Sequence, residues 1–234
     1  MTSSQSDRLS QLTKEPSEKA LKDIYFISGL GADKRVFQRL EFKGYQPVHI
    51  DWLEPKPDES LAEYAQRLTT QIKSEHPIII GLSFGGIVAI EIAKHIQVEQ
   101  IILISSTKNK SEIPFYLKIL RWFPIHRIFP YQTFLFIGYS LIKWFFGLEN
   151  KEECQLLKAI LFDTDAHFIK WAIHRVVIWN NETIPEHLYH IHGESDRIFP
   201  IRFVKPDFTI EKAGHLMVLN RAFQISKLIE KVIN

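Results

Sequence analysis

Three residues of this chain have the types and order needed for nucleophilic attack on a carbonyl carbon. Ser83 lies at the centre of a Gly-Leu-Ser-Phe-Gly segment, Asp196 ends a His-Gly-Glu-Ser-Asp segment, and His215 directly follows a glycine. A serine hydroxyl is a poor nucleophile until an adjacent imidazole accepts its proton, and a carboxylate must fix the tautomer of that imidazole. Ser83, His215 and Asp196 are therefore candidates for a nucleophile, its base and the residue that orients the base.

The segment around Ser83 has the pattern of a strand, a tight turn and a helix. Residues 78–80 are three isoleucines, which suit a buried strand, and residues 87–94 place apolar side chains on the inner side of a helix. Glycines two residues before and after Ser83 leave room where a Cβ atom would clash. Such a turn holds the hydroxyl clear of the sheet and directs helix N–H groups at an oxyanion. A glycine-rich connector that merely contains a serine would show the same pattern, so Asp196 and His215 decide whether Ser83 is interpreted as a nucleophile.

The neighbouring segments predict the sheet that positions these residues. The sequence predicts further strands at 22–28, 45–51, 100–105, 187–192 and 207–210, and helices at 34–40, 61–75 and 220–232. Ser60 and Glu63 match a capping box, and Pro47 places its strand at an edge. The β-α-β order predicts an α/β fold with a mostly parallel sheet of about six strands and helices on both faces. Ser83, Asp196 and His215 would then meet at the carboxyl edge of the sheet.

The alternation of strands and helices stops at about residue 108 and resumes at about residue 184. We therefore divide the chain into a mobile N-terminal extension (1–21), an α/β core (22–107 and 184–234) and a helical lid insertion (108–183). Prolines cut the lid insertion into short helices. Its longest uncharged run, 128–142, falls short of the roughly 18–20 residues of a membrane span.

The lid insertion is rich in aromatic and basic residues. The aromatic residues are Phe115, Tyr116, Trp122, Phe123, Phe129, Tyr131, Phe134, Phe136, Tyr139, Trp144, Phe145 and Phe146. The basic residues before position 147 are Lys108, Lys110, Lys118, Arg121, Arg127 and Lys143, against one acid, Glu112. Two interpretations stay open: the aromatic side chains form the lid's own core over an apolar pocket, or the lid also makes weak contact with a membrane surface.

Three segments resemble those of the α/β-hydrolase superfamily, in its serine-hydrolase branch with a helical cap. Residues 81–85 resemble the nucleophile elbow, residues 192–200 the acid loop, and residues 214–215 the histidine loop. The family's oxyanion loop usually begins with His-Gly, whereas this chain has Ser28 followed by glycine. The segment between the acid and histidine loops is also short, which predicts a single turn at 201–204 in place of a helix.

The resemblance implies a role for each matching residue. Ser83 would be the nucleophile, His215 the general base and acid, and Asp196 the residue that orients it. The backbone N–H groups of Leu30 and Phe84 would form the oxyanion hole. The implied function is a serine hydrolase that forms an acyl-enzyme, with small or medium-chain carboxylic esters as substrates. The same residues would serve amide, thioester or carbon–carbon cleavage.

Other assignments compete with this interpretation. Asp163, Asp165 or Glu194 could supply the acid. A metal site at His187, His190 and His192 is disfavoured, because on a strand the first faces opposite to the other two and no cluster of cysteines or carboxylates supports it. Two other classes of function also stay open: a ligand-binding protein with little turnover, and a lipid-surface protein that acts through its lid.

The composition limits the remaining classes. A net charge of +2 over 234 residues, without a dense Lys/Arg block, argues against nucleic-acid binding. The single cysteine, Cys154, excludes an internal disulfide and fits a reducing compartment. The N-terminus lacks an apolar signal segment. We therefore expect a cytoplasmic enzyme without a metal or cofactor, whose partner is a small apolar ester.

Overall fold

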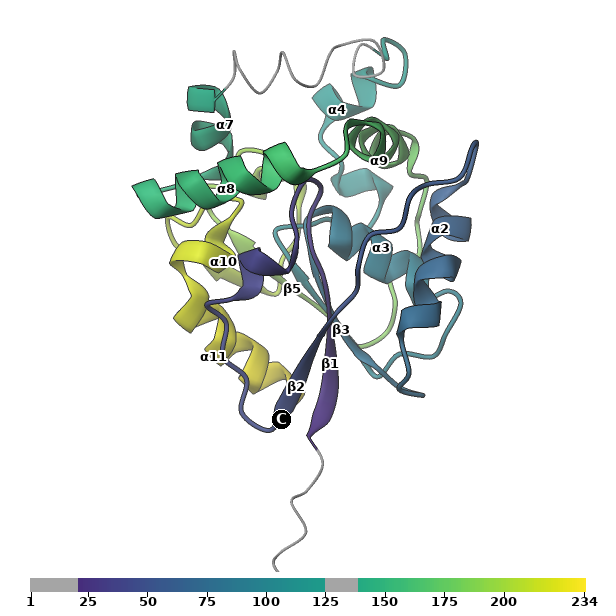
Figure 1. Cartoon of the computed structure of the whole chain (residues 1–234), viewed down its shortest axis with the longest axis vertical. Helices are drawn as coiled ribbons and strands as arrows, with labels where there is room; N and C mark the ends of the chain where they lie inside the picture. Colours follow the sequence, from purple (N-terminus) through teal and green to yellow (C-terminus); the bar gives the residue numbers. More distant parts are fainter. Residues whose placement is uncertain (1–20, 125–138) are drawn as a thin grey trace, which may run out of the picture.

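The computed structural model describes residues 21–124 and 139–234 of the chain (Figure 1). Its centre is a six-stranded sheet in the order β2-β1-β3-β4-β5-β6, in which every neighbouring pair is parallel. The strands are Lys22–Ile27 (β1), Tyr45–His49 (β2), Ile78–Leu82 (β3), Gln100–Ile104 (β4), Leu188–Gly193 (β5) and Phe208–Ile210 (β6). The predicted α/β fold is confirmed, and β2 is an edge strand, as its proline indicates.

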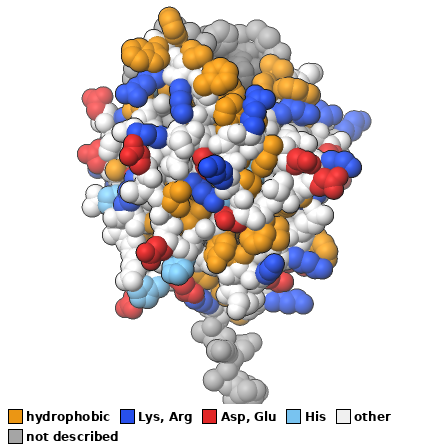
Figure 2. Space-filling model, turned by 180° about the vertical axis from the view of Figure 1, so that it is seen from behind, with side chains coloured by type: hydrophobic (Ala, Val, Ile, Leu, Met, Phe, Trp, Pro, Cys, Tyr) orange, Lys and Arg blue, Asp and Glu red, His pale blue; other side chains and the backbone are white. Residues whose placement is uncertain are grey.

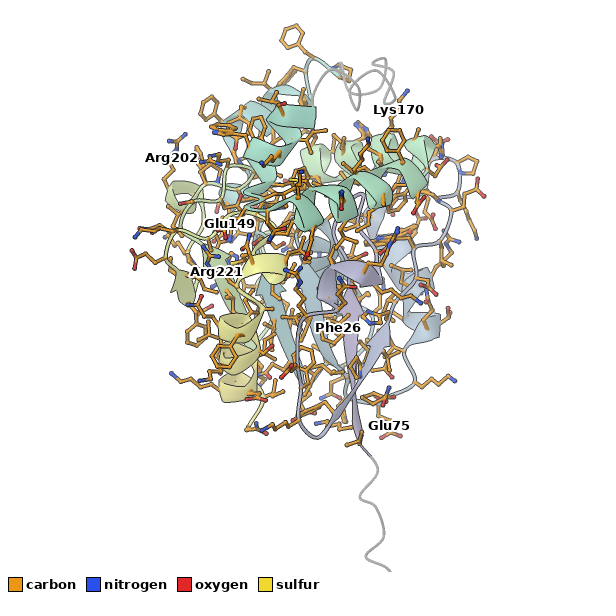
Figure 3. All side chains as sticks on the ribbon, turned by 60° about the vertical axis from the view of Figure 1, so that its left-hand side comes forward. Phe26, Glu75, Glu149, Lys170, Arg202 and Arg221 are labelled. Atoms are coloured by element: carbon orange, nitrogen blue, oxygen red, sulfur yellow. The ribbon has the colours of Figure 1, made fainter. Side chains whose placement is uncertain are left out.

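Helices cover both faces of the sheet (Figure 1). Helices α2 (Leu61–Leu68) and α3 (Phe84–Ile92) cover one face, and α10 (Met217–Asn220) and α11 (Ala222–Ile233) cover the other. Successive strand side chains point to opposite faces. Tyr25 and Ile27 accordingly join the core under α2 and α3, whereas Ile24 and Phe26 join the core under α11. Figure 3 labels Phe26 in the middle of the molecule, at the strands of the sheet.

Helix α3 is buried on every side, which goes beyond the expected inner apolar face. All nine of its residues are buried. A helix that is apolar all round must be enclosed. Side chains of α2 and of helix α9 (Ala166–Ile178) share one apolar cluster with α3, and the ring of Trp171 in α9 lies 6.3 Å from that of Phe84. The helix that follows Ser83 is therefore fixed from several sides.

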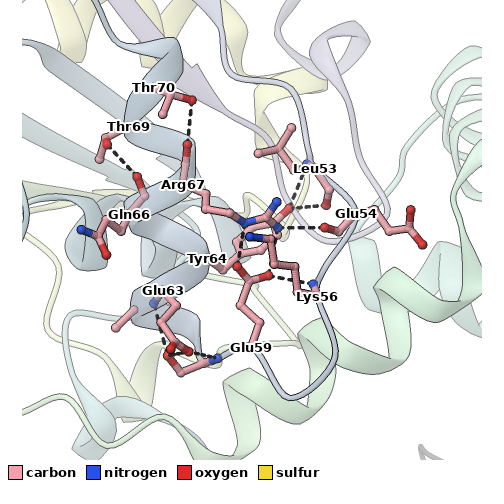
Figure 4. Close-up of polar contacts among 12 residues, drawn as sticks. Leu53, Glu54, Lys56, Glu59, Glu63, Tyr64, Gln66, Arg67, Thr69 and Thr70 are labelled. Atoms are coloured by element: carbon pink, nitrogen blue, oxygen red, sulfur yellow. Dashed lines mark hydrogen bonds and ion pairs between the residues drawn. The ribbon is translucent and has the colours of Figure 1, made fainter.

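Two predicted helices are shorter in the structure. The predicted capping box at the start of α2 is present, with Ser60 and Glu63 exchanging hydrogen bonds (Figure 4). The α-helix ends at Leu68 and passes into one 3₁₀ turn, η2 (Thr69–Gln71), where the hydroxyls of Thr69 and Thr70 donate to backbone carbonyls of the preceding turn. The predicted helix at 34–40 is one 3₁₀ turn, η1 (Lys34–Phe37).

The predicted lid insertion contributes four described α-helices: α4 (Phe115–Ile119), α7 (Tyr139–Phe146), α8 (Lys151–Asp163) and α9 (Ala166–Ile178). They lie across the upper end of the molecule in Figure 1, where the strands have their carboxyl ends. Arg221 forms an ion pair at 2.7 Å with Glu149, which precedes α8 (Figure 3). Arg35 forms another at 2.7 Å with Asp163, the last residue of α8. The two pairs connect both ends of α8 to the core. The role of these helices as a lid stays a prediction.

Some sequence predictions fall outside the described residues. They are the N-terminal extension up to residue 20 and the aromatic residues Phe129, Tyr131, Phe134 and Phe136. The short turn predicted at 201–204 is present as η4 (Ile201–Phe203).

Candidate active site

Ser83 sits in a strained turn between β3 and α3. Its φ of 52° and ψ of −117° lie in a region that side chains disfavour. A Cβ atom on Gly81 would come within 2.5 Å of the backbone of Gly85, and one on Gly85 within 2.3 Å of the backbone of Ile27. Both glycines are therefore required where β3, α3 and β1 meet, as the spacing around Ser83 predicts.

The turn lies where the sheet topology reverses direction. From β1 the chain moves to β2 on one side and later to β3 on the other, so a crevice opens between the carboxyl ends of β1 and β3. The loop after β1 reaches this crevice, since a Cβ atom on Gly29 would lie 3.3 Å from Cβ of Ser83. The sheet itself thus brings the two loops of the expected oxyanion hole together.

The structure brings the three predicted catalytic residues into one chain of hydrogen bonds. Oγ of Ser83 lies 2.9 Å from Nε2 of His215, and Nδ1 of His215 lies 2.7 Å from Oδ2 of Asp196. Because a carboxylate only accepts, Nδ1 of His215 carries the proton and Nε2 is free to accept the Ser83 hydroxyl proton. Asp196 and His215 are buried, and Ser83 is half-buried. This arrangement can activate a serine for attack on a carbonyl.

The second oxygen of Asp196 is held by its own loop. Oδ1 accepts the backbone N–H groups of Ile198 at 2.8 Å and Phe199 at 2.9 Å. Burial alone would raise the pKa of the Asp196 carboxyl. The charge and hydrogen bond of His215, together with the N–H of Phe199, outweigh burial and hold that pKa below its ordinary value. Asp196 is therefore ionised where the imidazole needs it, with a fixed orientation.

Two further histidines lie behind Asp196 in a defined tautomer. Nε2 of His192 lies 2.7 Å from the carbonyl oxygen of Phe199, so this nitrogen must carry a proton. Nδ1 of the neutral His192 ring then accepts a hydrogen bond from the N–H at Nε2 of His190, at 3.0 Å. Burial lowers the pKa of both imidazoles, despite the Asp196 carboxylate 3.5 Å from His192. The neutral N–H of His192 thus faces both Asp196 and the loop that holds it.

The expected oxyanion donors belong to the start of α3 and to the loop after β1. Phe84 is the first residue of α3, where backbone N–H groups lack an intrahelical partner. Leu30 lies in the loop after β1, and hydrogen bonds within this loop fix its shape. Oγ of Ser28 donates to the Ala32 carbonyl at 2.7 Å, and the Ala32 N–H donates to the Gly29 carbonyl at 3.0 Å. Nε1 of Trp52 adds a third bond, to the same Ala32 carbonyl, at 3.3 Å. Ser28 thus helps to shape this loop.

Residues from the insertion reach His215, which the sequence pattern did not predict. The ring of Phe146 lies 5.7 Å from that of His215, and the Phe146 carbonyl accepts the N–H of Leu216 at 3.0 Å. Gly147 and Gly214 meet so closely that a Cβ atom on either would lie 2.7 Å from the other residue. Phe199 flanks the imidazole on another side, at 5.8 Å. Two aromatic rings therefore flank the imidazole.

The rival acids lie elsewhere. Asp163 pairs with Arg35, Asp165 caps α9 through the Phe168 N–H, and Glu194 accepts the N–H of Lys212. Within residues 21–124 and 139–234, no group of three His, Cys, Asp or Glu side chains could hold a metal ion. Cys154 is buried in α8.

Comparison with known proteins identifies the family of the chain. A sequence model of the alpha/beta hydrolase family matches residues 24–225. The chain belongs to this family. Among curated proteins, none is detectably similar to this α/β hydrolase in sequence. In the described parts of the chain, no helix is long and apolar enough to cross a membrane.

Solved structures share the fold of this α/β hydrolase at low identity. A lipase described as putative from Acinetobacter baumannii AYE is 16% identical, with a TM-score of 0.68 over 92% of this chain and 85% of that one. An esterase from Exiguobacterium antarcticum is 15% identical, with a TM-score of 0.68 over 91% and 92%. A meta-cleavage product hydrolase from Pseudomonas fluorescens IP01 is 15% identical, with a TM-score of 0.64 over 91% and 90%.

Proposed function

We propose that this α/β hydrolase cleaves small or medium-chain carboxylic esters through an acyl-enzyme on Ser83. The observation that carries the proposal is the hydrogen-bond chain from Ser83 through His215 to Asp196, at 2.9 and 2.7 Å. Family membership supports hydrolysis in general. The esterase and lipase among the structural neighbours favour an ester, whereas the meta-cleavage product hydrolase is a neighbour of another reaction type.

In the first half of the proposed reaction, Oγ of Ser83 attacks the ester carbonyl while Nε2 of His215 accepts the hydroxyl proton. The negative charge that develops on the carbonyl oxygen is stabilised by the N–H groups of Leu30 and Phe84. Asp196 stays ionised and stabilises the imidazolium. His215 then gives its proton to the leaving alcohol, and Ser83 carries the acyl group.

In the second half, a water molecule takes the place of the alcohol. His215 accepts a proton from this water, the resulting hydroxide attacks the acyl carbon, and the proton returns to Oγ of Ser83. The products are a carboxylic acid and the free enzyme. Phe146 and Phe199 beside the imidazole favour an apolar acyl or alcohol group over a charged one.

The proposal is tested with p-nitrophenyl esters of graded acyl length and with the p-nitroanilide of the preferred acyl chain. We expect ester hydrolysis that Ser83→Ala abolishes. A burst of p-nitrophenol equal to the enzyme concentration would identify the acyl-enzyme. Equal rates for the ester and the anilide would contradict the ester assignment. Hydrolysis that survives Ser83→Ala would contradict the mechanism.

A further inference from the structure

The helical insertion exposes large apolar side chains at one end of the molecule. We call six of them the cap face: Phe115, Ile119, Trp122, Phe123, Trp144 and Phe145. Their exposed fractions run from 37% for Phe145 to 80% for Trp122. Figure 1 places α4 and α7 at the same end, and Figure 2 shows hydrophobic side chains gathered there. Exposed apolar clusters of this kind mark interaction surfaces in soluble proteins.

Positive charge accompanies the cap face. The segments 113–124 and 139–148 contain Lys118, Arg121 and Lys143 and no aspartate or glutamate. All three basic side chains are exposed. A fourth cation, the Arg197 guanidinium, lies 4.3 Å from the ring centre of Trp144. The partner of this face must therefore accept apolar side chains and carry negative charge.

We propose that the cap face docks the enzyme on an anionic lipid bilayer. Trp and Phe side chains insert at the boundary between headgroups and acyl chains, while Lys and Arg beside them bind anionic headgroups. A second copy of this chain fits the same face poorly. A two-fold contact would bring Lys118, Arg121 and Lys143 of one copy against those of the other, and like charges repel.

Docking on this face would place the reaction beside the bilayer. Helix α7 presents Trp144 and Phe145 to solvent, and its last residue, Phe146, contacts the ring of His215. The lipid-facing surface and the wall of the candidate active site are thus parts of one short helix. An apolar ester dissolved in the membrane would then be concentrated where Ser83 reacts. This consequence rests on the proposed function, but the docking itself does not.

The test is co-sedimentation with vesicles of phosphatidylcholine, alone or mixed with phosphatidylglycerol. We expect binding to the mixed vesicles that weakens as salt is raised. A Lys or Arg near an anionic surface strengthens binding by about fivefold, so Lys118→Glu with Arg121→Glu weakens it by at least about 25-fold. Trp122→Ala with Phe123→Ala weakens binding to both kinds of vesicle. Ser83→Ala, which removes the reaction alone, binds as the wild type does.

Helix α11 offers a matched control for these variants. Phe223 is 70% exposed and Nζ of Lys227 lies 4.4 Å from its ring centre, so Phe223→Ala with Lys227→Glu removes an aromatic and a cation away from the cap face. We expect this control to bind vesicles as the wild type does, with circular dichroism checking that every variant folds. Absence of wild-type binding, or equal loss in the control, would overturn the proposal. Self-association that the cap-face variants abolish, without vesicle binding, would assign the face to a dimer.

Discussion

Replacing Asp196 by asparagine should leave the fold intact and move the proton of the His215 imidazole from Nδ1 to Nε2. Oδ1 of Asp196 accepts two backbone N–H groups, from Ile198 and Phe199. The amide of the introduced asparagine must keep its oxygen at that position, because an NH₂ group there would face two donors. Its NH₂ group then takes the place of Oδ2, 2.7 Å from Nδ1 of His215, and donates to it. His215 is forced to carry its proton on Nε2, where it cannot accept one from Ser83.

The expected effect on rate follows from this change of tautomer. A wrong tautomer in a triad costs about 10⁴-fold in kcat, or about 5.5 kcal/mol of transition-state stabilisation. Thermal unfolding should change little, because both backbone donors to Asp196 keep an acceptor. Stopped-flow and steady-state ester hydrolysis would measure kcat, and circular dichroism the melting temperature. Glu194→Gln is the matched control, since Glu194 accepts from the Lys212 N–H and does not contact His215. A variant with kcat within tenfold of the wild type would refute the reasoning.

Two further predictions follow from buried polar groups. Burial holds the pKa of His190 well below its ordinary value. As the pH falls below 6.5, the unfolded chain binds a proton at His190 and the folded protein does not, so the free energy of unfolding decreases. Between pH 6.5 and 5.5 this decrease is about 1 kcal/mol. The His190→Gln variant, which can still donate to His192, should lack this decrease when the free energy of unfolding is measured in urea at each pH. An unchanged dependence of that free energy on pH in the variant would count against a neutral His190. The Ser28→Ala substitution removes the hydrogen bond from the Ser28 hydroxyl to the Ala32 carbonyl, which still accepts the bond from Trp52. It should lower kcat by up to about tenfold with little effect on KM. The Ser111→Ala substitution, at an exposed serine, should leave kcat unchanged. A normal kcat in Ser28→Ala would show that the hydroxyl does not hold the loop.

The sequence predicted what local patterns determine. The isoleucines of β3 favour a buried strand, and Gly81 and Gly85 predicted the tight turn at Ser83, where the backbone leaves no room for a Cβ atom at either position. The order of strands then predicted that Asp196 and His215 would reach the same edge of the sheet, and the hydrogen bonds show them there.

Other features depend on contacts between distant residues and could not be predicted in this way. The contact of Phe146 with His215 joins positions far apart in the chain, and the periodicity of apolar residues along the sequence does not predict it. Helix α2 ends at Leu68 and passes into one 3₁₀ turn, η2 (Thr69–Gln71), whereas the sequence predicted a helix to about residue 75. The shared face of His190 and His192 follows from strand alternation, but their tautomers follow only from the Phe199 carbonyl.

The central claim is that Ser83 is an activated nucleophile, and covalent labelling tests it most directly. A fluorophosphonate probe should add to the wild-type protein at one site, seen as one mass increment in the intact protein, because attack on phosphorus needs the same proton transfer to His215. Ser83→Ala, folded by circular dichroism, should not react, and Asp196→Asn should react far more slowly. Absence of labelling in folded wild type, or equal labelling of Ser83→Ala, would contradict the account.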